Sequence, residues 1–180
     1  RSAVILVVAE VRGGALNRAS WEAVACAQQA AAGEPLAIVV AGGGEAARLV
    51  AEAGVGEVLS VEHEALAAYT PDVQVAVVSQ LIAQTSPRLV VMAHTYQARD
   101  YAPRLAARLR VPLVADVIGL KGSGATATFL RPMFQGKLQA DIAVDGPHVA
   151  TFQIGAYRAD AMKAGAAPAP PWAGRWTPRC

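Results

Sequence analysis

The chain has 180 residues, of which 54% are hydrophobic and 17% are charged, and its mean hydropathy is +0.32. This composition is sufficient for a packed core and excludes a disordered chain. The longest uninterrupted apolar run, Ala3–Ala9, is much shorter than the roughly 20 residues that a membrane-spanning helix needs. We therefore expect a globular protein and no membrane insertion.

The net charge of +2 is distributed in a way that excludes a nucleic-acid-binding surface. Three basic residues and no acid follow Asp160, so residues 1–162 carry a net charge of −1, whereas domains that bind the phosphate backbone are basic. The two cysteines, Cys26 and Cys180, form no CxxC motif and no cluster with histidines. We therefore expect neither a disulfide scaffold nor a metal site. We expect the protein to be located in a reducing compartment, the bacterial cytoplasm.

Short β-branched runs alternate with helical segments through the first 120 residues. Buried strands are predicted at Ala3–Ala9, Leu36–Ala41, Glu57–Val61, Leu89–Ala93 and Val114–Leu120. Helices are predicted between them, at Asn17–Ala32, Glu45–Ala53, Thr70 to about Thr85, and Tyr101–Arg110. This alternation predicts an α/β fold, a Rossmann-like parallel sheet with helices on both faces.

The pattern changes after Leu120. Three short runs, Thr126–Met133, Lys137–Val144 and His148–Ile154, are separated by Gln135-Gly136 and by Asp145-Gly146-Pro147. Because Asp-Gly between two such runs is a hairpin signal, we expect all three runs to form an antiparallel extension.

The last segment, residues 164–180, has the composition of a linker. It is rich in Ala, Gly and Pro and contains Trp172 and Trp176, and such segments are semi-extended. The two tryptophans are expected either to pack on the preceding domain or to contact a neighbouring one. Since the chain also begins at Arg1 without a methionine or a leader, we expect one domain, residues 1–163, cut from a longer protein.

Candidate chemical groups are few. Gly42-Gly43-Gly44 follows a strand and precedes a helix, but it is not GxGxxG, and a tight turn explains it better than an anion site. The histidines, His63, His94 and His148, have no metal-pair spacing; His94 is the best candidate because it ends a strand, where open α/β sheets hold ligands. Because no nucleophile elbow is present and Cys26 lies in a helix that suggests packing, an α/β hydrolase is disfavoured.

A basic cluster lies on the fourth predicted helix and around it. It comprises Arg99, Arg104, Arg108 and Arg110, with Asp100 among them. A solvated helix face explains such a cluster, and a subunit interface or an anion site remains the alternative.

Three blocks resemble the electron transfer flavoprotein alpha subunit. They are the run from Thr95 through Arg99-Asp100 to Leu109, followed by Asp116; the segment Arg131-Pro132-Met133-Phe134-Gln135-Gly136-Lys137; and Ala150-Thr151-Phe152-Gln153-Ile154-Gly155-Ala156-Tyr157. Ala9-Glu10 fits the opening of the family. The departures are Ala98 and Arg110 in place of glycine, and Gln153-Ile154 in place of Arg-Pro.

The resemblance implies that this chain is the N-terminal domain of an alpha subunit, with an adenine nucleotide alpha hydrolase-like fold. It also implies a heterodimer with a beta subunit, and an electron carrier rather than an enzyme, which takes electrons from acyl-CoA and similar dehydrogenases to a membrane quinone oxidoreductase. FAD would be bound mainly by an absent C-terminal domain. We expect the partner interface to include Arg99, Asp100, Arg131, Phe134, Gly136 and Lys137.

A stand-alone adenine-nucleotide-binding module of the universal-stress type would share the same architecture. Such a module needs a glycine-rich phosphate loop after the fourth strand. Here that position reads His94-Thr95-Tyr96-Gln97-Ala98, with bulky side chains where backbone amides would approach phosphate. The nucleotide module is therefore the second interpretation.

Overall fold

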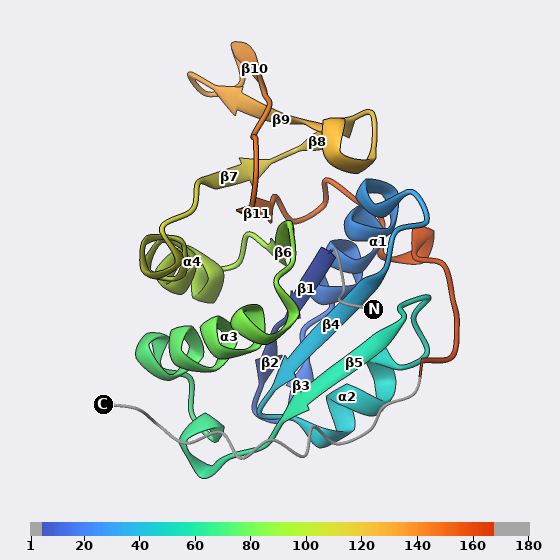
Figure 1. Ribbon diagram of the computed structural model, residues 1–180, viewed down its shortest axis with the longest axis vertical. Coiled ribbons are helices and arrows are strands. Elements are labelled where there is room, and N and C mark those ends of the chain that lie inside the picture. Colours follow the sequence, from blue (N-terminus) through green and yellow to red (C-terminus); the bar gives the residue numbers. More distant parts are fainter. Residues whose placement is uncertain (1–4, 168–180) are drawn as a thin grey trace.

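The computed structural model describes residues 5–167. A six-stranded parallel sheet forms the centre of the molecule (Figure 1). The strand order is β5-β4-β1-β6-β11-β7, and every neighbouring pair is parallel. The bounds are β1 Ile5–Ala9, β4 Leu36–Ala41, β5 Glu57–Val61, β6 Leu89–Ala93, β7 Leu113–Val117 and β11 His148–Phe152. The α/β Rossmann-like fold class is confirmed.

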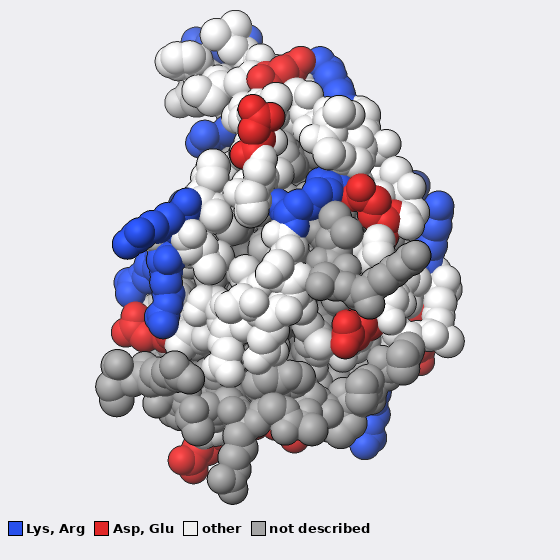
Figure 2. Space-filling view, viewed as in Figure 1, with Lys and Arg blue, Asp and Glu red and all other residues white. Residues whose placement is uncertain are grey.

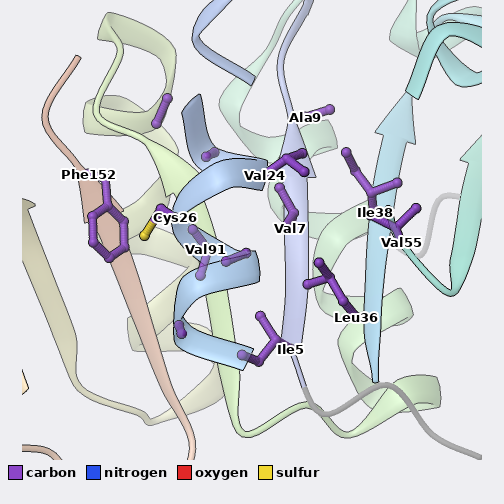
Figure 3. Close-up of a cluster of buried hydrophobic side chains, with 14 of the residues drawn as sticks. Ile5, Val7, Ala9, Val24, Cys26, Leu36, Ile38, Val55, Val91 and Phe152 are labelled. Atoms are coloured by element: carbon purple, nitrogen blue, oxygen red, sulfur yellow. The ribbon is translucent and has the colours of Figure 1, made fainter. Parts of the chain in front are cut away.

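Helices cover both faces of this sheet. One apolar cluster joins α1 (Ala19–Ala31) and α2 (Gly44–Val50) to the strand residues of one face. A second cluster joins α3 (Pro71–Thr85) and α4 (Tyr96–Leu109) to the other face. Figure 3 shows the first cluster, in which Cys26 of α1 lies near Phe152. Because both faces are covered, the central strands are continuous apolar runs rather than alternating ones.

An antiparallel sheet of three strands lies beyond the β7 edge of the parallel sheet, at the top of Figure 1. Its strands are β8 Gly119–Lys121, β9 Thr128–Met133 and β10 Leu138–Ile142, in the order β10-β9-β8. We call residues 119–142 the hairpin arm. The short elements are β2 Val11–Arg12, β3 Ala15–Leu16, and the 3-10 turns η1 Glu64–Leu66, η2 Gly124–Thr126 and η3 Ala159–Ala161.

One part of the predicted extension was wrong. The run His148–Ile154 does not pair with the hairpin arm; its residues His148–Phe152 form β11, which inserts between β6 and β7 of the parallel sheet. All five residues of β11 are buried, because a strand with covered neighbours on both sides and helices above and below has no face toward solvent. Asp145-Gly146 is therefore part of a crossover connection and not of a hairpin.

Other boundaries differ in smaller ways. The helix predicted from Tyr101 begins five residues earlier, at Tyr96, because the Thr95 side chain accepts a hydrogen bond from Ala98 N–H and caps it. The run predicted as Val114–Leu120 is divided into β7 and β8, which belong to different sheets.

Residues 164–167, predicted as the start of the linker, hydrogen-bond to the residues directly after α2: Gly165 N–H donates to the Glu52 carbonyl and Ala167 N–H to the Ala51 carbonyl. Trp172 and Trp176 lie outside the described residues. Among residues 5–167, no helix is long and apolar enough to cross a membrane.

Candidate functional site

The carboxyl ends of β1 and β6 meet at the point where the order of the strands reverses. After β1 the chain adds β4 and β5 on one side, and then β6 on the other. Open α/β sheets bind ligands in the crevice at such a switch point. Glu10 follows β1 directly, and His94 and Thr95 follow β6.

The Glu10 carboxylate occupies this junction and is held by three donors. The Thr95 hydroxyl donates to Oε2, while Asn17 Nδ2 and Arg12 Nε donate to Oε1 at 2.8 and 2.7 Å. Since Thr95 is the N-cap of α4, the carboxylate lies at the positive end of that helix dipole. Glu10 thereby provides from within the chain the negative charge that a phosphate would bring to this helix terminus.

A cleft of about 230 Å³ lies beside this junction, lined by the β2–β3 turn, the residues after η1, and Gly42. Gly42 has φ +84°, and a Cβ added there would lie 2.9 Å from the carbonyl oxygen of Leu66, so the turn requires glycine. The charged side chain that lines the cleft is Arg12, whose Nε already donates to Glu10. The cleft therefore offers no uncommitted cation to a nucleotide phosphate.

A second hollow, of about 310 Å³, lies at the carboxyl ends of β6, β11 and β7, beside α4 and the hairpin arm. Its polar lining residues are His94, Arg99, Asp116, Arg131 and Thr151, and we call it the carboxyl-edge pocket. It brings together side chains from all three blocks that carry the family resemblance. Figure 2 shows basic side chains gathered over α4 at the left of the view.

Thr151 organises the floor of this pocket. Its Oγ1 lies 2.8 Å from His94 Nδ1 and accepts a hydrogen bond from Asp116 N–H at 3.2 Å. The β7–β11 pairing shifts by one residue at this point, and Asp116 has φ +59°. This shift in register is a β-bulge, which changes the direction of a side chain. Aspartate adopts the left-handed backbone conformation more readily than most residues. Asp116 Oδ1 consequently lies 3.9 Å from His94 Nε2.

Burial lowers the pKa of His94 below its usual value of 6.5, and the positive charges of Arg99 and Arg131 lower it further, against the opposing effect of Asp116. The neutral form of the His94 ring is therefore favoured at pH 7. The two arginines and the one carboxylate leave the pocket with a net positive charge.

The six predicted interface residues divide into three groups. Arg99 and Arg131 both line the carboxyl-edge pocket. Asp100 lies in a separate network, where it accepts a hydrogen bond from the Tyr69 hydroxyl at 3.0 Å and pairs with Arg104. The other three lie at the tip of the hairpin arm and are exposed; they are Phe134, Gly136 and Lys137.

The tip of the hairpin arm combines exposure with an unusual backbone. Phe134 and Gln135 have φ of +50° and +58°, and the Phe134 side chain is 71% exposed. A bulky residue with positive φ is a genuine outlier. Leu138, in the adjoining strand, is 60% exposed. Nothing within the described chain covers these two apolar side chains.

The remaining candidates have structural roles. His63 Nδ1 accepts the Ala65 N–H bond that caps η1. The Nδ1 atom of His148 hydrogen-bonds the Gly146 carbonyl, and its buried Nε2 has no hydrogen-bond partner among residues 5–167. Burial raises the pKa of the Cys26 thiol, which disfavours a reactive thiolate. No group of metal-binding side chains is found among residues 5–167.

The arginine cluster on α4 is exposed, as expected for a solvated face, except that Arg99 borders the pocket. Arg104 pairs with Asp72 and Asp100. Arg110 has φ +57° and caps the end of α4 in the left-handed conformation, where glycine is usual.

Sequence reasoning did not predict the role of Glu10. The available signal was an acid placed directly after an apolar strand at the switch point, but its partners Asn17 and Thr95 are 7 and 85 residues away. The bulge at Asp116 likewise has no local signature, because it depends on the insertion of β11.

Comparison with known proteins gives the family. The chain matches the electron transfer flavoprotein domain over residues 5–173. It is 32% identical over 138 residues to the electron transfer flavoprotein subunit alpha of Bacillus subtilis, covering 74% of this chain and 42% of that protein. It is also 32% identical to the Mycobacterium tuberculosis subunit alpha (88% and 49%) and to protein FixB of Clostridium saccharobutylicum (85% and 48%). It thus spans about half the length of these relatives. On these matches, the chain belongs to the electron transfer flavoprotein family and is of the alpha-subunit type.

Proposed function

We propose that the chain is the N-terminal scaffold domain of an alpha subunit, residues 1–163, followed by a linker to an FAD-binding domain. The whole protein, paired with a beta subunit in the bacterial cytoplasm, carries electrons on FAD. It takes them from acyl-CoA and similar dehydrogenases and passes them to a membrane quinone oxidoreductase. The chain acts as part of a carrier and not as an enzyme. The match to the family over residues 5–173, at half the length of the relatives, carries this proposal.

We expect this domain not to bind FAD. The turn after β1 reads Glu10-Val11-Arg12-Gly13-Gly14 and lacks the glycine spacing of a dinucleotide fold. The Glu10 carboxylate lies at the adjoining N-terminus of α4, where a phosphate of the cofactor would otherwise bind. FAD is therefore assigned to the other half of the protein.

The purified 180-residue chain should accordingly be colourless. Absorbance between 350 and 500 nm, measured after gel filtration, should show no flavin, even when FAD was added in excess beforehand. Flavin retained at near one equivalent per chain would overturn the proposal that this domain is a scaffold.

The hairpin arm is the part of this domain that we assign to partner contact. Strand β10 is an unpaired sheet edge, and such edges pair with other chains unless they are protected. At the tip, an aromatic side chain is held exposed on a backbone that costs free energy. Exposed Phe134 and Leu138 supply an apolar centre and Lys137 a polar rim, the usual arrangement of an interface.

Affinity measurements on the full-length alpha and beta subunits test this surface. Phe134→Ala should weaken the heterodimer by about 2 kcal/mol or more, as for an aromatic hot spot, and Lys137→Glu should also weaken it. Leu49→Ala is the matched control, because Leu49 is 44% exposed on α2, away from the arm. Unchanged affinity in both arm variants would show that the arm is not the contact surface.

A further inference from the structure

We propose that the carboxyl-edge pocket binds a small oxyanion, a carboxylate or a phosphate group, between the guanidinium groups of Arg99 and Arg131. These arginines come from α4 and β9, and they border one hollow of about 310 Å³. That volume is at the lower end of the range for ligand sites. Guanidinium groups bind carboxylate and phosphate through paired hydrogen bonds, which suits them to this chemistry.

Neither arginine is neutralised within the described part of the chain. No carboxylate of residues 5–167 lies within 4 Å of Arg99 or Arg131, whereas Arg104, on the same helix, pairs with both Asp72 and Asp100. Arg99 contacts the ring of Tyr96, with its guanidinium carbon 5.8 Å from the ring centroid. This contact favours one orientation of the side chain and leaves its positive charge unneutralised.

Hydrogen bonds and a strand irregularity hold the residues at the floor of the pocket in defined positions. Thr151 is 1% exposed, and its hydroxyl group holds both His94 and the backbone of Asp116. Asp116 is kept in the left-handed conformation by the bulge in β7, and backbone strain of this kind is concentrated at functional sites. The Asp116 side chain is 37% exposed, so a ligand in the pocket can reach it.

Asp116 limits which anions can enter. Its carboxylate faces His94 Nε2, so a ligand bound by both arginines lies near one negative charge and one neutral ring. The pocket therefore favours a single compact anionic group over a larger polyanion. Removal of the Asp116 charge should tighten binding, since like charges within a few ångströms repel.

Titration of the purified chain with inorganic phosphate, and separately with acetate, tests the site. Backbone and imidazole NMR shifts are recorded at pH 7 and at constant ionic strength set with chloride. Saturable shifts of the His94 and Thr151 signals are expected with at least one of the two anions. Comparison of the two titrations shows whether the site prefers a phosphate or a carboxylate. Absence of saturable shifts with both anions would overturn the proposal.

Variants locate the binding. Arg99→Gln and Arg131→Gln should each weaken binding at least tenfold, Arg131→Lys less, and Asp116→Asn should strengthen it. Arg104→Gln is the matched control on α4 and should bind like the unaltered chain. Equal affinity in all the arginine variants would mean that the anions bind elsewhere. The outcome is independent of the proposed function, because neither FAD nor a beta subunit is needed.

Discussion

The Thr95 hydroxyl makes two hydrogen bonds, so Thr95→Ala should destabilise the fold substantially. It accepts the bond from Ala98 N–H that caps α4, and it donates to the Glu10 carboxylate. Loss of an N-cap costs about 1 kcal/mol, and loss of a hydrogen bond to a charged group about 1.5–3 kcal/mol. Because Asn17 and Arg12 still hold Glu10, the carboxylate is not left unpaired. The two costs add to about 2.5–4 kcal/mol, and we expect a loss of about 2.5–3 kcal/mol, in the lower part of that range.

Urea unfolding measures this cost, with Thr70→Ala as the matched control. Thr70 is the N-cap of α3, but its side chain makes no capping hydrogen bond and is exposed, so its replacement should change the free energy of unfolding by less than about 0.5 kcal/mol. Thr95→Ser keeps the hydroxyl and should stay close to the unaltered chain. If Thr95→Ala lowers the midpoint no more than Thr70→Ala does, at an equal m-value, the Glu10–Thr95 contact does not stabilise the fold.

Three further outcomes follow from the same structure. Burial lowers the folded-state pKa of His148 and His94 below 6.5, so the unfolded chain binds protons first and stability should fall as the pH decreases below about 6.5. His148→Gln should make the urea midpoint less dependent on pH between 7.5 and 5.5, and an unchanged dependence would contradict this reasoning. Calorimetry should detect no micromolar binding of AMP or ATP, because Glu10 occupies the switch point; binding at that level, about −8 kcal/mol, would favour a nucleotide module. Arg110→Gly should stabilise the chain by about 1 kcal/mol, because Arg110 has φ +57° and glycine adopts this left-handed conformation without a steric cost. An unchanged or lower midpoint of thermal unfolding in this variant would contradict the prediction.

Local patterns predicted much of the fold. The helix α3 begins at Pro71 and ends at Thr85, as its cap, first-turn proline and first-turn acid indicate. The strands β4, β5 and β6 have the predicted bounds, because short β-branched runs between turns are recognisable without reference to their neighbours. His94 lies at the carboxyl end of its strand, as expected.

The tertiary structure decided which strands are neighbours. The run from His148 to Phe152 was recognisable as a strand, but only the packed sheet places it between β6 and β7. That insertion creates the β7 bulge and brings Thr151 to His94 and Asp116. Glu10 and Thr95 likewise meet across 85 residues of sequence. Sequence periodicity reports how each segment is buried, whereas pairing between distant segments depends on the free energy of the whole core. The strands could therefore be predicted from the sequence, but the pocket that they form could not.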